Sequence, residues 1–202
     1  PRFSWLSSWR AATSFTILRI SSMCFILSYI QGITYGALPI SLSHKIAPQY
    51  VGLVMSLFYI IPLMATFNLG KSSDILGRRK TYIIVAYVLC FAAFILLAIG
   101  KNLAGILLAV VLFGLNFSIM SPVTMALVGD IAEDKKIELI TSTILMMRGL
   151  GTVCALFISL FLANFYLYGV SLLLAVLSFL LVLPLMKLSF QDIKSKIAEE
   201  IG

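Results

Sequence analysis

The charge of this sequence is concentrated in a short stretch between two long apolar runs. Residues 69–80 read LGKSSDILGRRK and hold one aspartate and four basic side chains. Arginine guanidinium groups form paired hydrogen bonds with carboxylates, so this stretch is suited to ion-pair chemistry. The nearest carboxylates are Asp74 itself and Asp130, near the end of a later apolar run. We therefore expect a charge cluster that contains Asp74, Arg78, Arg79 and Asp130.

Two glycines frame the same stretch. The chain has to reverse direction between the flanking apolar runs, and Gly77 permits the tight turn that this reversal requires. Gly70 permits either a close approach between helices or a left-handed turn. Asp74 lies near the point at which a helix N-terminus would accept a negative charge. Lys80 completes the basic triplet that follows the second glycine.

Four other polar side chains interrupt the apolar runs. They are Gln31, Tyr35, Asn116 and Arg148. Polar groups at such positions are costly in a membrane and commonly functional, so all four are candidates for contact with a solute. Arg148 suits contact with an anion; alternatively, it reaches back to the region of Asp130. For the other three, the alternative is a hydrogen bond between helices, worth about 0.6 kcal/mol.

The composition identifies the solvent that surrounds these residues as lipid. A soluble domain carries about 25% charged residues, whereas this chain of 202 residues is 61% hydrophobic and 11% charged. A helix needs about 20 apolar residues to cross a bilayer, and none of the runs shows the alternation of a membrane β-barrel. We predict an all-α integral membrane bundle of six transmembrane helices. The runs cover residues 15–40, 51–69, 81–100, 103–129, 139–163 and 167–187.

Polar segments flank the predicted bundle, which occupies residues 15–187. Residues 1–14 carry two Trp and two Arg, a composition that suits the membrane interface or the end of a cytoplasmic linker. Residues 188–202 place apolar side chains at helical spacing. This tail predicts an amphipathic helix on the inner leaflet, with a solvated helix or a frayed end as the alternative.

The distribution of basic residues predicts the orientation, because basic residues mark the cytoplasmic side of a membrane protein. With six spans, the side that holds both termini carries most of the basic residues, and the other side carries only Lys45 and Lys101. Both termini are therefore expected in the cytoplasm, with the chain in the inner or plasma membrane. The net charge of +7 follows from this asymmetry and requires no nucleic acid.

The stretch from Gly70 to Lys80 resembles the signature that the major facilitator superfamily carries between its second and third helices. That signature reads Gly-x-Leu-Ala-Asp-Arg-x-Gly-Arg-Arg/Lys. The sequence keeps both glycines, the aspartate and the basic residues, and it departs from the pattern at Ser72 and Ile75. The position of the stretch, between the second and third predicted spans, strengthens the resemblance.

The resemblance implies a transporter of twelve helices that works by alternating access, of which this chain is one half. It also implies that the charge cluster is an inner gate that latches the outward-open state, and that the first and fourth spans line the cavity. The alternative is a loop that only sets topology. The expected partners are the lipid bilayer, the other six-helix half of the same polypeptide and a small-molecule solute.

The C-terminal half is favoured on four observations. The sequence does not begin with Met, its signature is degraded, its polar lead-in suits a central linker, and its tail is amphipathic. The N-terminal half is the alternative, because both halves enter and leave the membrane from the cytoplasm. No carboxylate or histidine lies within a predicted span, so a proton-coupled carrier would hold its titrating group elsewhere. A uniporter or an anion exchanger fits as well.

Other classes of protein fit the sequence less well. An intramembrane enzyme needs a nucleophile with a base, yet the single histidine, His44, lies in a predicted outer loop. Neither Gly-x-Ser-x-Gly nor HExxH occurs. The three cysteines fall in separate spans and predict core packing rather than a metal site. We expect no catalytic residue, metal or cofactor; a non-transporting scaffold or receptor derived from a transporter remains an alternative.

Overall fold

The computed structural model describes residues 15–76, 79–99, 102–131, 137–162, 164–188 and 195. These residues form long α-helices, each of which contains a stretch long and apolar enough to cross a membrane. This confirms the predicted all-α bundle of six membrane-crossing helices. The helices are α2 (Phe15–Ser43), α3 (Pro48–Leu76), α4 (Arg79–Ile99), α5 (Leu103–Ile131), α6 (Ile137–Phe161) and α7 (Asn164–Lys187).

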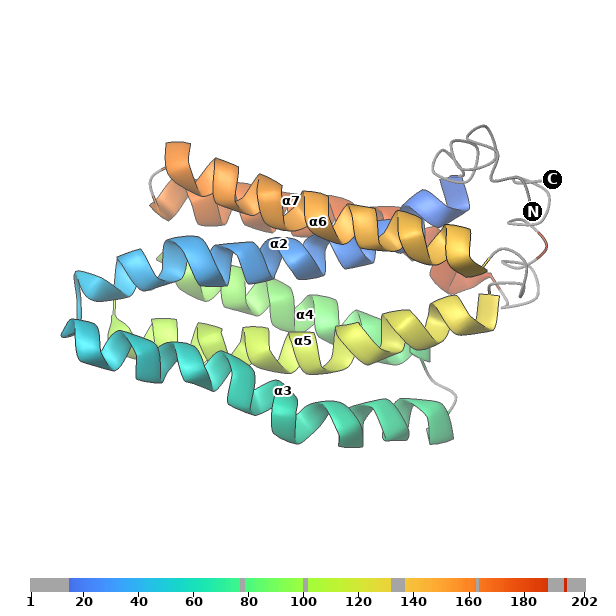
Figure 1. Cartoon of the computed structure of the whole chain (residues 1–202), viewed down its shortest axis with the longest axis horizontal. Coiled ribbons are helices and arrows are strands. Elements are labelled where there is room, and N and C mark those ends of the chain that lie inside the picture. Colours follow the sequence, from blue (N-terminus) through green and yellow to red (C-terminus); the bar gives the residue numbers. More distant parts are fainter. Residues whose placement is uncertain are drawn as a thin grey trace.

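The helices run alternately in opposite directions (Figure 1). As a result, α2, α4 and α6 are parallel to one another, and α3, α5 and α7 run antiparallel to them. Arg79, Asp130 and Lys187 lie at the same end of the bundle, which we call the charged end. Ser43 and Ile99 lie at the opposite end. The end of α3, which holds Asp74, and the start of α4, which holds Arg79, therefore belong to the charged end.

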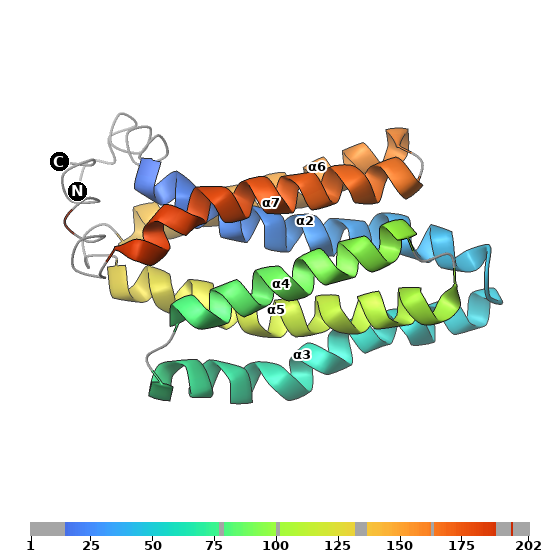
Figure 2. The same cartoon turned by 180° about the vertical axis from the view of Figure 1, so that it is seen from behind.

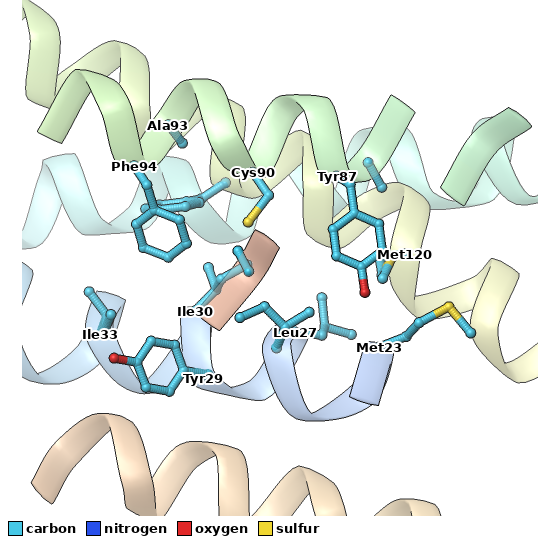
Figure 3. Close-up of a cluster of buried hydrophobic side chains, with 14 of the residues drawn as sticks. Met23, Leu27, Tyr29, Ile30, Ile33, Tyr87, Cys90, Ala93, Phe94 and Met120 are labelled. Atoms are coloured by element: carbon cyan, nitrogen blue, oxygen red, sulfur yellow. The ribbon is translucent and has the colours of Figure 1, made fainter. Parts of the chain in front are cut away.

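Helix α2 occupies the centre of the bundle. In Figure 1, α5 and α6 lie nearest to the viewer. Figure 2, which is seen from behind, has α4 and α7 nearest to the viewer, and we call this the far side. Helix α2 runs between the two pairs. In the apolar stretch of α2 that could cross the membrane, 67% is buried. The corresponding share is 11% in α3, which lies at the edge beside α5. Figure 3 shows Leu27 and Ile30 of α2 facing Cys90 and Phe94 of α4 across this core.

The closest helix contact joins α2 to α6. A Cβ atom added at Gly32 would lie 2.6 Å from the Cβ atom of Ala155, and one added at Gly151 would overlap the backbone oxygen of Phe25. Small residues let helix backbones approach in this way, which is a principal route to helix association in lipid. Because no side chain separates the backbones here, the rotation of α6 relative to α2 is fixed.

Hydroxyl groups tie the far-side helix α7 to the rest of the bundle. The Tyr87 hydroxyl of α4 lies 2.7 Å from Ser178 Oγ, and Ser178 Oγ also lies 3.1 Å from the backbone oxygen of Ser22 on α2. A second pair joins Tyr29 to Ser171 at 3.1 Å. Polar groups in lipid need partners inside the protein, and these hydroxyls supply them for one another.

The observed helix ends differ from the predicted ones mainly in α3. The helix continues through Gly70 and Asp74 to Leu76, so the left-handed turn considered for Gly70 is wrong. Pro62 lies inside this continuous helix, which bends along its length in Figure 1. The predicted lead-in, 1–14, lies outside the described residues, as does almost all of the predicted tail.

We predict that Gly151→Ala destabilises the protein, whereas Gly149→Ala does not. The added methyl group at 151 would collide with the Phe25 carbonyl, and such overpacking costs about 1–3 kcal/mol. At Gly149 nothing lies within 4 Å of the added atom. Thermal unfolding of the purified variants in detergent measures the difference. Equal midpoints for the two variants would contradict the close α2–α6 contact.

Candidate functional site

An ion pair joins α4 to α5 at the charged end. Arg79 Nη1 contacts Asp130 Oδ2, with the two side chains 17% and 41% exposed. Arg79 begins α4 and Asp130 lies one residue from the end of α5, so antiparallel packing brings them together. The contact expected between the basic triplet and Asp130 is thus made by Arg79. At this exposure the pair contributes about 0–1 kcal/mol.

The pair also compensates for two unfavourable positions. Arg79 places a positive charge at the N-terminus of α4, and Asp130 places a negative charge near the C-terminus of α5. Each charge is opposed by the dipole of its own helix, because cations are favoured at helix C-termini and anions at N-termini. Each is favoured by the dipole of the neighbouring antiparallel helix. The arrangement therefore couples the ends of α4 and α5 more strongly than it stabilises either helix alone.

Lys80 connects α4 to a third helix. Its Nζ donates to the backbone oxygen of Met186 at 2.9 Å and to that of Leu188, at the end of α7. The last carbonyls of a helix have no partner within the helix, and a lysine can satisfy them. The sequence contains no direct sign of this contact, because the contact depends on α4 and α7 lying side by side.

Ser72, which departs from the family signature, also makes a contact between helices. Its Oγ donates to the Leu69 backbone oxygen at 2.9 Å, and it lies 2.8 Å from the Tyr82 hydroxyl on α4. The first bond stays within α3 and the second joins α3 to α4. The polar residue therefore links the two helices on either side of the connection.

The remainder of the expected charge cluster is described only in part. Gly77 and Arg78 lie outside the described residues, and the structure describes the backbone of Asp74 but not its side chain. Asp74 belongs to the last turn of α3, so it lies near a helix C-terminus within its own helix. The start of α4 at Arg79 follows five residues later.

Three of the four polar residues in the apolar runs are at least half-buried, and one is exposed. Arg148 on α6 and Gln31 on α2 are half-buried. Tyr35 is 43% exposed, and its ring stacks on that of Tyr59 from α3, with centroids 5.9 Å apart and an angle of 10° between the planes. An arginine at the centre of a membrane helix costs about 2.5–3.5 kcal/mol, so the position of Arg148 requires a compensating contact.

Asn116 lies apart from the other three. It is 2% exposed, and its Nδ2 donates to the backbone oxygen of Ala86 on α4 at 2.7 Å. Its Oδ1 accepts no hydrogen bond among the described residues. This is the interhelical hydrogen bond that the sequence offered as the alternative, and it directs the amide towards α4 rather than towards a surface that a solute could reach.

We predict that Lys80→Met frays the end of α7. Hydrogen bonds that involve a charged donor contribute about 1.5–3 kcal/mol. Loss of about 1–2 kcal/mol of local stability accelerates amide exchange about 5- to 30-fold. Hydrogen–deuterium exchange at residues 185–188 measures this effect, and Lys71→Met, which removes an exposed lysine from α3, is the matched control. Unchanged exchange in the Lys80 variant would show that this contact does not hold the helix end.

The comparisons with known proteins agree with this arrangement. The family model described as Major Facilitator Superfamily matches residues 20–200, which include every helix described above except the first turn of α2. No curated protein matches the chain. Members of this family are multi-pass membrane transporters rather than enzymes. Since the match extends over most of the chain and the helices are arranged as a membrane bundle, the protein belongs to the major facilitator superfamily.

Proposed function

We propose that the chain is one six-helix half of a twelve-helix carrier that moves a small solute by alternating access. The observation that carries this proposal is the family match over a complete six-helix unit. Halves related by an axis along the membrane normal build such carriers, and the pathway lies between them. We assign the chain to the C-terminal half, with the N-terminal half as the alternative, and the charged end to the cytoplasm.

In this proposal the charged end acts as an inner gate. Arg79 holds α4 to α5, Lys80 holds α4 to α7, and Ser72 and Tyr82 hold α3 to α4. These contacts hold the ends of four helices together at the charged end. Asp74 and Arg78 complete the proposed gate in sequence, and this gate latches the outward-open state. Several weak contacts of this kind are sufficient to bias an equilibrium of a few kcal/mol.

The solute pathway in this proposal follows one side of α2. Gln31 and Tyr35 are four residues apart and therefore lie on one face of the helix. Tyr35 contacts Tyr59 of α3, whereas Tyr29 contacts Ser171 of α7. The face that carries Gln31 and Tyr35 thus differs from the one that packs on α7. We assign Gln31, Tyr35 and Arg148 to the pathway and leave Asn116 to helix packing.

Alternating access predicts that Gln31→Cys reacts from both sides of the membrane, because a mid-depth residue is exposed in turn to each. The test uses the full-length carrier in proteoliposomes, with the native cysteines replaced and a membrane-impermeant maleimide added on one side at a time. We expect Arg79→Ala to raise labelling from the inner side and lower it from the outer side. Loss of about 0.5–1 kcal/mol corresponds to a change of about two- to fivefold.

Leu173→Cys serves as the control for this experiment. Leu173 is 64% exposed on α7, the far-side helix, where we expect lipid to exclude the reagent from either side. Labelling of Gln31→Cys from one side only, with no response to Arg79→Ala, would indicate a static scaffold and contradict the proposal.

A further inference from the structure

Arg148 brings a positive charge deep into the bundle. It follows Ile140, where the apolar span of α6 begins, by eight residues, or about 12 Å along the helix. Helical side chains lean towards the N-terminus of their helix, and the Thr152–Ser28 contact one turn further along α6 and α2 sets Arg148 level with Cys24 on α2. Cys24 lies nine residues beyond the start of α2, or about 13 Å along it. Both helices therefore place the guanidinium well inside the membrane-crossing part.

The packing of α6 on α2 fixes the direction of this side chain. Thr152 Oγ1 lies 3.3 Å from the backbone oxygen of Ser28. Because the two helices are parallel, one turn back along both leads from this contact to Arg148 and Cys24. The backbone contact at Gly151 prevents α6 from turning away. Arg148 is therefore held against α2 and does not project freely into lipid.

No carboxylate among the described side chains neutralises Arg148. Asp130, which the sequence suggested as a partner, is paired with Arg79 instead. Glu138 precedes Arg148 on α6 by ten residues, or about 15 Å. The charge thus remains without an anionic partner in the part of the chain that the structure describes, although its depth calls for one.

Gln31 lies next along the same side of α2. It follows Cys24 by seven residues, which is close to two helical turns, so the two share a face. Gln31 is half-buried, and its amide offers both donors and an acceptor. The Arg148 guanidinium on α6 can bind the oxygens of a carboxylate or phosphate with two parallel hydrogen bonds, and the Gln31 amide on α2 can hydrogen-bond to a neighbouring polar group.

We infer that Arg148 binds the negatively charged group of the transported solute, which is therefore a small organic or inorganic anion, and that Gln31, about 10 Å further along α2, contacts another part of it. This inference rests on the proposed transport function. The same chemistry has a second source, a carboxylate contributed by the other half of the carrier. In that case Arg148 would have a permanent partner and would not select for the charge of the solute.

The test compares probes of matched shape and different charge on the purified full-length carrier. Benzoate and phosphate are the anions, benzamide is the neutral analogue of benzoate, and benzylammonium is the cation. The apparent midpoint of thermal unfolding reports binding, because a ligand that binds the folded state stabilises it. The variants are Arg148→Gln, Arg148→Lys and the control Lys71→Gln, which removes an exposed positive charge at the charged end.

We expect benzoate or phosphate to raise the midpoint, and benzamide and benzylammonium to leave it unchanged. Arg148→Gln should weaken the anion effect about tenfold or more, whereas Arg148→Lys retains part of it and Lys71→Gln retains all of it. Absence of any anion effect, an equal effect of benzamide, or an effect that survives in Arg148→Gln would overturn the inference.

A carboxylate from the other half of the carrier, as the partner of Arg148, would give a different result. If the other half neutralises Arg148, then Arg148→Gln lowers the midpoint without any probe present, and no anion raises the midpoint of the parent protein; this outcome also overturns the inference. Labelling of Gln31→Cys from both sides depends on no charged solute. Reciprocal labelling without an anion effect would therefore reject only the anion site and leave the transport function standing.

Discussion

The contact between α2 and α6 determines how the bundle is organised, because lipid provides no hydrophobic drive for helices to associate. Association depends instead on close packing and on hydrogen bonds. Gly32 and Gly151 let the two backbones touch, and Thr152 adds a hydrogen bond between them. With α6 held in this way, α2 becomes the helix around which α4, α5 and α7 arrange themselves. The position of Arg148 follows from the same contact.

The polar residues divide into two groups that depend on different physics. At the charged end, Arg79 and Lys80 are partly exposed, and there single contacts are weak and helix dipoles add to them. Deeper in the bundle, Arg148 and Gln31 are half-buried in membrane-crossing helices, where a charge without a partner is costly. The first group therefore suits small adjustments between states, and the second suits selection of what is bound.

Much of the fold could be predicted from the sequence, because lipid leaves few choices for a chain with six apolar runs. The C-terminal end of α3 could not, since the predicted span ends at residue 69 and the helix continues through Ser72 to Leu76. Complementary charge was sufficient to propose a contact with Asp130. The contact of Lys80 with α7 was not predictable, because its partners are backbone oxygens. The position of a residue along a predicted span does not determine which way its side chain faces, so the sequence offers Asn116 as a candidate for solute contact although it faces α4.

The pairing of α2 with α6 has a consequence for biosynthesis. Three helices lie between them in the chain, so α2 enters the bilayer well before the surface on which it packs exists. During that interval its glycine-lined groove faces lipid or the insertion machinery. Contacts between segments this distant in sequence form late and slow the assembly of a domain. A chain that ends before α6 would therefore leave the Gly32 surface of α2 uncovered, which makes it a natural substrate for membrane quality control.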